Sequence, residues 1–246
     1  MSGLGYTSAM PETTNSNRLQ QKLVKYKPSA ETIQLIRQTP IVLLVGISGA
    51  GKDSIKQRLL KTGDYHHIVS HTTRRPRENK GIVERDGVDY HFIDLSEAER
   101  MLDSGAYVEA KLYSGNVYGT SVAEIQKAHD DGKIALTDIE VQGVAEYKAI
   151  SKSVHAVFVL PPSYQVWQQR LRNRSGGNID PEDLARRLQT AKIELQEALN
   201  KNYFEFVIND ELESAVTTVD GIAHEISHTK KSQATRELAQ QLLTEL

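Results

Sequence analysis

The stretch LLVGISGAGKDSIKQRL, residues 43–59, decides how this chain is expected to fold. It joins an apolar run to a helical pattern through Gly46, Gly49, Gly51 and Lys52. A glycine-rich turn between a buried strand and a helix lets backbone N–H groups surround phosphate oxygens, and the helix N-terminus adds a partial positive charge. The stretch therefore predicts a nucleotide-phosphate loop, or P-loop, in which Lys52 reaches the terminal phosphates.

One residue of this loop departs from the usual pattern. Asp53 stands where a Ser or Thr hydroxyl normally binds Mg²⁺. A carboxylate is also a hard oxygen ligand suited to Mg²⁺, and Asp is electrostatically favourable in the first turn of a helix. Both interpretations are open, and Ser54 offers a hydroxyl one residue later. The loop alone predicts triphosphate binding with a stronger dependence on Mg²⁺.

Apolar runs alternate with helical patterns along most of the chain. Residues 41–45, 133–139 and 154–160 are continuous runs rich in Val, Ile, Leu and Ala, and 204–208 is a weaker case. Such runs are typical of strands buried on both faces of a parallel sheet. The helical patterns between them cover residues 52–61, 121–130, 141–149, 163–173, 181–200 and 212–227. The alternation predicts an α/β fold with a central parallel sheet flanked by helices.

The middle of the chain breaks this rhythm. Short alternating segments at 88–93, 106–113 and 116–120 surround one helical pattern at 96–103. We therefore expect a small mixed α+β insertion here.

The two ends differ from the body of the chain. Residues 1–27 are rich in Ser, Thr, Asn and Gln with little periodicity, which predicts a flexible extension. Residues 29–38 predict a short helix capped by Ser29. The last segment, 229–246, is expected to form an amphipathic helix that packs loosely on the body or on a partner.

Composition excludes several classes of protein. The 246 residues carry a net charge of only −2, so a uniformly basic nucleic-acid surface is not expected. There is no cysteine, which excludes disulfides and thiolate metal sites. No apolar run approaches the roughly 20 residues that cross a bilayer, and the first 20 residues lack the apolar core of a secretory signal. We expect a soluble cytoplasmic protein.

Three arginines lie close together after a probable strand. Arg74, Arg75 and Arg77 occur within the stretch HTTRRPR, residues 71–77. Guanidinium groups pair well with phosphate oxygens, and Tyr90 offers a hydroxyl nearby. The cluster predicts a second phosphate site; the alternative is a solvated basic loop.

Ordered motifs over about residues 41–226 together resemble the guanylate kinases. They begin with Ser70-x-x-x-Arg74-x-x-Arg77 and ERDGVDY at 84–90. They continue, in the same order, with YVEAKLYSGNVYGT (107–120), LTDIEVQGV (136–144), VFVLPPS (157–163), RLRNR (170–174), ARRL (185–188) and VIND (207–210). The resemblance implies transfer of the γ-phosphoryl group of ATP to GMP and dGMP, with Mg²⁺ as cofactor.

The resemblance also assigns residues to the donor side. Those implied to bind ATP are Gly46, Ser48, Gly49, Ala50, Gly51, Lys52, Asp53, Ser54 and Asn209, the last through adenine. Those implied to act in transfer are Lys52, Arg74, Arg170, Arg174 and Arg187. Asp53 and Asp138 are the implied metal ligands, directly or through water. No general base is expected, because a phosphate with a second pKa of about 6 is already mostly dianionic at neutral pH.

The residues implied to bind GMP divide between phosphate and base. They are Ser70, Arg74, Arg77, Tyr90, Glu109, Tyr118, Thr120, Asp138 and Glu140. Guanine presents N1–H and N2–H₂ donors, and a carboxylate such as Glu109 can accept both. Adenine cannot offer that pair, so a buried acceptor would be left unpaired at a cost of about 1–3 kcal/mol or more.

The domain boundaries follow from the same resemblance. Residues 1–40 form an extension, 41–228 a guanylate kinase-like domain and 229–246 a helical tail. Within the domain the expected parts are a core (41–73, 128–169 and 188–228), a GMP-binding insertion (74–127) and a lid (170–187). The expected partners are ATP and GMP, with no nucleic acid and no membrane; a homo-oligomer is left open.

Departures from the family pattern keep two alternatives open. Glu140 stands where an Asp is usual and Thr120 where a Ser is common, and the segment between Arg77 and Glu84 and the lid are longer than usual. Asp53 is shared with the ribose 1,5-bisphosphate phosphokinases, which supplies a rival substrate. The other alternative is a non-catalytic guanylate kinase-like binding module, although such modules have degraded phosphate loops.

Overall fold

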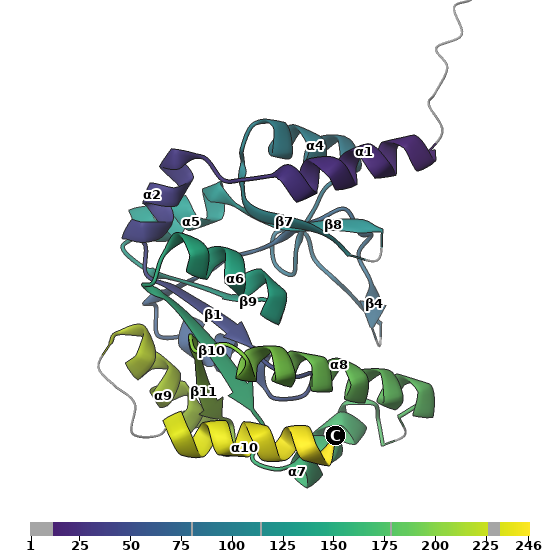
Figure 1. Ribbon diagram of the computed structural model, residues 1–246, viewed down its shortest axis with the longest axis vertical. Coiled ribbons are helices and arrows are strands. Elements are labelled where there is room, and N and C mark those ends of the chain that lie inside the picture. Colours follow the sequence, from purple (N-terminus) through teal and green to yellow (C-terminus); the bar gives the residue numbers. More distant parts are fainter. Residues whose placement is uncertain (1–11, 80, 114, 178, 226–231) are drawn as a thin grey trace, which may run out of the picture. The chain divides into compact units, whose positions relative to one another are not determined.

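The computed structural model describes residues 12–79, 81–113, 115–177, 179–225 and 232–246 (Figure 1). The chain divides into two compact units. Within the described residues, the insertion unit comprises 12–32 and 69–124, and the P-loop unit comprises 33–68, 125–225 and 232–246. The insertion was expected at 74–127, and the compact unit that contains most of it runs from Val69 to Glu124 and includes part of the N-terminal segment.

A five-stranded parallel sheet forms the centre of the P-loop unit. Its strands, in the order β11-β10-β1-β9-β2, are β11 (Phe204–Ile208), β10 (Val154–Leu160), β1 (Ile41–Val45), β9 (Ile134–Asp138) and β2 (Tyr65–His67). Every residue of β1 is buried, as expected for a strand covered on both faces. The predicted parallel sheet is confirmed, and β2 is the strand that the apolar runs did not reveal.

Helices cover both faces of this sheet (Figure 1). Their bounds are α2 (Ala30–Gln38), α3 (Lys52–Leu60), α5 (Val122–Asp130), α6 (Val141–Ile150), α7 (Tyr164–Arg174), α8 (Pro181–Leu199) and α9 (Leu212–Ala223). α3 packs with α9, while α6 packs with α8. Local signals set the helix starts: Ser163 accepts from Val166 N–H, and Asp180 caps α8, which begins with proline.

The C-terminal helix belongs to the P-loop unit. α10 (Ser232–Glu245) packs against α8 and β11. Ala239 and Leu242 are buried, and the Arg236 guanidinium donates to the carbonyl oxygen of Leu199. The predicted amphipathic helix is present, but it is docked on the unit rather than loosely attached.

A four-stranded mixed sheet forms the insertion unit. Its order is β6 (His91–Phe92), β3 (His71–Thr72), β8 (Asn116–Ser121) and β7 (Tyr107–Tyr113), and helix α4 (Leu95–Asp103) lies between β6 and β7 in the chain. The segment between Arg77 and Glu84 forms a separate hairpin of β4 (Glu78–Asn79) and β5 (Ile82–Val83). The predicted strand at 88–93 is reduced to the two residues of β6.

The prediction of a flexible N-terminal extension is wrong for residues 12–25, which form helix α1 (Glu12–Lys25). Leu19 is buried with α4 and Tyr107, and Leu23 and Tyr26 pack against the same cluster. Lys22 and Asp103 form an ion pair at 2.8 Å. The apolar residues recur at i, i+4 and i+7, a helical spacing that the polar composition masked. Residues 1–11 lie outside the described part of the chain.

Within the described residues, no helix combines the length and the apolar character that crossing a membrane requires.

Tyr26 offers a test of how α1 is anchored. Its hydroxyl donates to Tyr107 C=O at 2.5 Å and accepts from Tyr107 N–H at 3.0 Å. We expect Tyr26→Phe to lower the free energy of unfolding by about 1–2 kcal/mol, because both backbone groups of a buried strand lose their partner. Urea denaturation measures the loss. Tyr113→Phe, at a 58 % exposed tyrosine, is the matched control and should have little effect. Equal stability of the two variants would contradict this role of the hydroxyl.

Candidate active site

The P-loop follows β1 at the carboxyl end of the parallel sheet, where ligands bind in open α/β folds. Gly46 has a φ of 139°, and a Cβ placed there would lie 2.4 Å from the carbonyl oxygen of Val159. Gly51 has a φ of 98°, and its Cβ would lie 2.1 Å from Asn209 Nδ2. Glycine is therefore required at both positions by backbone angle and by space.

Side chains from later in the sequence hold the loop in place. The indole N–H of Trp167, on α7, donates to Ser48 C=O at 2.7 Å. The buried amide of Asn209 donates to Ala50 C=O at 2.8 Å. The Arg170 guanidinium donates to Asn209 C=O at 2.9 Å. Two side chains thus hold carbonyl groups of the loop, and Arg170 holds the segment that carries Asn209. The N–H groups of the loop do not take part in these bonds.

Two of the three predicted lid arginines contact the loop or its supports. Arg170 does so through Asn209, and Arg187 donates to Ser48 Oγ at 2.8 Å. Arg187 also donates to Asp183 on the preceding turn of α8 at 2.8 Å. Because a carboxylate orients this guanidinium, Arg187 presents a fixed positive charge beside the loop.

Lys52 lies at the first position of α3 and folds back over the loop. Its ammonium group donates to Gly46 C=O. Burial lowers the pKa of Lys52, while the negative charges of Glu194, Asp138 and Asp53 oppose the shift. Arg174 adds to the lowering through repulsion, so it lies within electrostatic range of Lys52.

The two predicted metal ligands, Asp53 and Asp138, both lie beside the ammonium group of Lys56. Lys56 Nζ lies 3.9 Å from Asp53 Oδ1 and donates to Asp138 Oδ1. Partial burial raises the pKa of Asp138, but the charges of Lys56 and Lys52 outweigh it and hold that pKa below its usual value. Two carboxylates that converge on one cation are a donor set that fits Mg²⁺. Among the described residues no group of three or more acidic or His side chains forms an all-protein metal site.

The insertion unit gathers a second set of predicted residues around Arg74. Its guanidinium forms a paired contact with Glu84, at 2.8 and 3.0 Å, and Nε donates to the Tyr118 hydroxyl at 3.2 Å. The guanidinium carbon lies 5.3 Å from the centre of the Tyr90 ring. The Glu84 hydrogen bond raises the pKa of Arg74, and Arg74 in turn lowers the pKa of Glu84. Arg74 is therefore an oriented, permanently charged anion site.

Arg77 lies next to this set but is exposed. Its backbone N–H donates to Glu84 Oε2 at 2.7 Å, the same oxygen that Arg74 contacts at 2.8 Å. One carboxylate thus fixes both the Arg74 fork and the backbone that carries Arg77.

Glu109 and Thr120 form a buried polar pair on neighbouring strands. Glu109 is 8 % exposed and Thr120 is 1 % exposed. Glu109 Oε1 accepts from Thr120 N–H at 3.2 Å and from Thr120 Oγ1 at 3.0 Å. Ser70 precedes β3 in the same unit, and its carbonyl oxygen accepts from His91 N–H at 2.9 Å. The carboxylate of Glu109 is therefore held in a fixed orientation.

Three further predicted residues lie in the P-loop unit. Asp138 and Glu140, implied to bind GMP, belong to the P-loop unit, where Asp138 contacts Lys56 and Glu140 is the exposed residue that precedes α6. Asn209, implied to contact adenine, has its amide engaged by the loop. Their implied contacts with nucleotide stay predictions.

Sequence reasoning missed Trp167, Glu84, Lys56 and Glu194 as parts of the site. Two of them left a signal in the sequence, since Glu84 opens the ERDGVDY motif and Lys56 lies three residues after Asp53, the spacing of neighbours on one helix face. Glu194 Oε2 is buried without a hydrogen-bond partner among the described residues. Burial raises the pKa of Glu194 to about 7, with Lys52 opposing and Glu140 reinforcing the shift.

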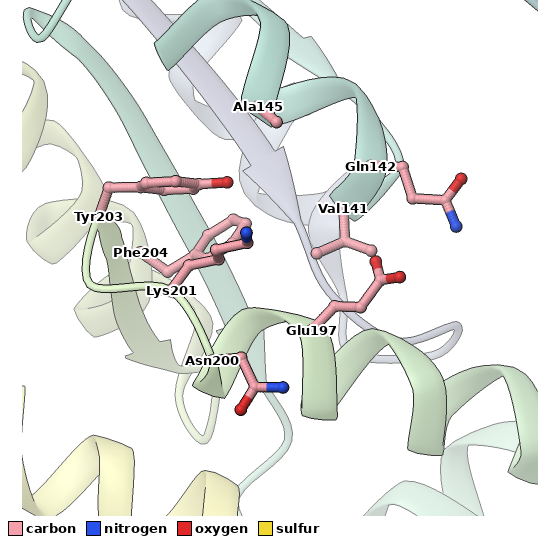
Figure 2. Close-up of a pocket in the computed structure, with 8 residues that line it drawn as sticks. All are labelled: Val141, Gln142, Ala145, Glu197, Asn200, Lys201, Tyr203 and Phe204. Carbon is pink, nitrogen blue, oxygen red and sulfur yellow. The ribbon is translucent and has the colours of Figure 1, made fainter. Parts of the chain in front are cut away.

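A separate pocket of about 400 Å³ lies between α6 and α8 (Figure 2). Val141 and Ala145 line it from α6, and Glu197 lines it from α8. Tyr203, just before β11, and Phe204, the first residue of β11, complete this side of the lining. None of the sequence-predicted site residues is part of its lining. The candidate site is therefore defined by the P-loop and the Arg74 cluster.

A glycine loop on a parallel sheet, a lysine at the start of the following helix and arginines fixed against that loop define a P-loop kinase fold. The guanylate kinase family model matches residues 37–225. The chain belongs to the guanylate kinase family.

Individual relatives agree with this membership. The guanylate kinase of Schizosaccharomyces pombe is 36 % identical over 196 residues, which cover 78 % of this chain and 94 % of that protein. The Homo sapiens guanylate kinase is 36 % identical over 198 residues, covering 79 % and 96 %. Guanylate kinase 1 of Oryza sativa subsp. japonica is 39 % identical over 180 residues, but the chain spans only 45 % of that longer protein.

A solved structure agrees in fold. The guanylate kinase from Anaplasma phagocytophilum has a TM-score of 0.56 and 23 % identity, and the match covers 80 % of this chain and 90 % of that one. At this identity the likeness supports the fold alone.

Glu194 gives a testable pH dependence. Its folded pKa of about 7 exceeds the ordinary value of 4.5, so the folded protein holds a proton that the unfolded chain has lost. The stability gained from this proton is complete below pH 4.5 and disappears as the pH rises through 7. We expect the stability of wild type relative to Glu194→Gln to fall by about 2 kcal/mol between pH 5 and pH 8.

Urea denaturation at several pH values measures this difference. Glu182→Gln, at an exposed carboxylate on the same helix, is the control and should show no such slope. A flat difference between wild type and Glu194→Gln would show that burial does not shift this carboxyl.

Proposed function

We propose that the chain is a guanylate kinase that transfers the γ-phosphoryl group of ATP to GMP or dGMP, giving ADP and GDP or dGDP. Membership of the guanylate kinase family over residues 37–225 supports this activity. The relatives from Schizosaccharomyces pombe and Homo sapiens, which carry that name, are matched over almost their whole length. The intact loop glycines and Lys52 favour an active kinase over a binding module with a degraded loop.

The observation that carries the choice of acceptor is the buried Glu109–Thr120 pair. A carboxylate at 8 % exposure, fixed by two hydrogen bonds from one threonine, is a preorganised acceptor. The N1–H and N2–H₂ groups of guanine would satisfy such an acceptor, whereas adenine presents an acceptor at N1. A site built to accept hydrogen bonds rejects a ligand that cannot donate them.

The Arg74 cluster is the proposed site of the GMP phosphate. Arg74, Tyr90 and Tyr118 lie within one group of contacts, and Arg77 extends from the same loop. Guanidinium forks bind phosphate oxygens in pairs, as Arg74 binds the two oxygens of Glu84 in this structure. This arrangement favours a phosphorylated acceptor in which a base is also recognised, and so favours GMP over ribose 1,5-bisphosphate.

In transfer, the protein would act through position and charge more than through covalent chemistry. Lys52, Arg170, Arg174 and Arg187 would stabilise negative charge on the moving phosphoryl group. The GMP phosphate needs no general base, because its second pKa is about 6. Asp53 and Asp138, with Ser54 nearby, would hold Mg²⁺. When bound, the ion would neutralise charge on the phosphates of ATP.

Finer assignments belong to the same proposal. Residues 170–187 would act as a lid that excludes water, and residues 74–127 would bind GMP. We propose Mg²⁺ as cofactor, the cytoplasm as location, purine nucleotide metabolism as context, and ATP and GMP as the partners. Among the described residues the fixed contacts of Arg187 and Arg170 with the loop support a role for both arginines in closing over the donor.

An acceptor panel tests the substrate. Coupled ADP release is measured with GMP, dGMP, AMP and ribose 1,5-bisphosphate. We expect GMP and dGMP to be preferred over AMP by at least about 10⁴ in kcat/KM, because adenine leaves Glu109 unpaired.

Glu109→Gln should reduce kcat/KM for GMP by about 10²-fold while leaving the KM for ATP nearly unchanged. In the acceptor panel, a preference for ribose 1,5-bisphosphate would contradict GMP as the acceptor and support the rival activity. In the variant, an equal loss in the use of GMP and of ATP would show that Glu109 does not recognise the base.

A substitution of Lys52 tests whether the chain is an enzyme or a non-catalytic binding module. We expect Lys52→Met to lower kcat by about 10³-fold or more, because charge on the transferring group loses its main side-chain partner in the loop. GMP binding, followed by isothermal titration calorimetry, should change little, since Lys52 belongs to the other unit. Unmeasurable turnover in the wild type, with GMP binding intact, would favour the non-catalytic module.

A further inference from the structure

We propose that Lys56 acts as a built-in cation between Asp53 and Asp138 and sets the concentration of divalent metal that the loop requires. The inference rests on the proposed function, because Mg²⁺ is part of that proposal. Lys56 lies outside the P-loop motif. Its positive charge would explain why the carboxylate of Asp53 is tolerated beside a triphosphate site.

The position of Lys56 follows from the helix that carries it. Asp53 lies in the first turn of α3, and Lys56, three residues later, lies on the same face. Its ammonium nitrogen lies 3.9 Å from Asp53 Oδ1 and donates to Asp138 Oδ1, at the end of β9. The lysine side chain is only 15 % exposed, so packing of α3 against β9 holds the ammonium between the two carboxylates.

Charge explains why the pair is needed. A hydroxyl at position 53 would be neutral, whereas Asp53 adds a negative charge to a site that already contains Asp138 and must receive anionic phosphates. Two like charges near one another and near phosphate are unfavourable unless a cation lies between them. Lys56 supplies that cation within the same helix, and Asp53 itself is 61 % exposed and accessible to a metal ion.

Competition for oxygen atoms is the consequence. Lys56 and a divalent ion both need the same carboxylate oxygens, and Asp138 Oδ1 already accepts from Lys56. A metal ion that binds Asp138 through Oδ1 would therefore displace the ammonium, and one that binds through Oδ2 would be repelled by it. Removing the lysine charge frees both carboxylates, so metal affinity in the absence of nucleotide should rise. A lysine with a purely structural role would instead affect stability and leave metal affinity unchanged.

Direct metal binding tests the proposal without using the reaction. Mn²⁺ is titrated into nucleotide-free protein, and free Mn²⁺ is followed by electron paramagnetic resonance. We expect Lys56→Met to bind Mn²⁺ at least about tenfold more tightly than wild type. Lys61→Met, which removes a charge just beyond the end of α3, is the matched control and should change the Kd by no more than about twofold.

Two further variants make the result specific. Lys56→Gln removes the charge but keeps a donor for Asp138, and it replaces Lys56→Met if circular dichroism shows the latter unfolded. Adding Asp53→Asn to either variant should abolish the gain in Mn²⁺ affinity. An unchanged Kd in the folded Lys56 variant, or an equal change in Lys61→Met, would overturn the proposal.

Its failure is distinguishable from failure of the proposed function. The Mn²⁺ titration involves neither GMP nor turnover, so it stands when the acceptor panel gives a negative result. Conversely, active phosphorylation of GMP together with an unchanged Mn²⁺ Kd would overturn only the role of Lys56.

Discussion

The contact between the amide of Asn209 and the carbonyl oxygen of Ala50 is the interaction on which the rest of the site depends. It joins the segment after β11 to the loop after β1, so the shape of the loop depends on the pairing of the parallel sheet. The same contact leaves no room for a side chain at Gly51, the residue that immediately precedes α3. Every charged group of the donor side, from Lys52 to Arg187, is positioned relative to that fixed loop.

Much of the fold was predictable because its signals are local. The strands β1, β10 and β11 begin and end at the residues that the apolar runs indicated, since strands buried on both faces must be apolar throughout. β2 was missed because Tyr65–His67 is short and polar. Helix α1 was missed because only Leu19, Leu23 and Tyr26 reveal its apolar face within a polar segment.

The candidate site was predictable in its residue types and less so in its contacts. The glycines, Lys52 and the arginines could be found because phosphate chemistry demands them at fixed spacings. The roles of Trp167 and Glu84 could not be found in this way, although Glu84 lies in a sequence motif, because these roles depend on tertiary contacts with Ser48 and Arg74. Asp53 was ambiguous for the same reason, since its partner Lys56 also has to reach Asp138 on another element.

Glu84 has a consequence for which molecules can enter the Arg74 cluster. Its two oxygens already fill the guanidinium fork, so any incoming anion must exchange with an anion that the chain itself supplies. A singly charged carboxylate would replace the Glu84 carboxylate with a group of the same charge, so its attraction to Arg74 would be no stronger. A dianionic phosphate carries one more negative charge and would be attracted to Arg74 more strongly. With the phosphate of GMP bound as proposed, the tethered glutamate would disfavour singly charged anions while it keeps Arg74 aligned for a dianionic ligand.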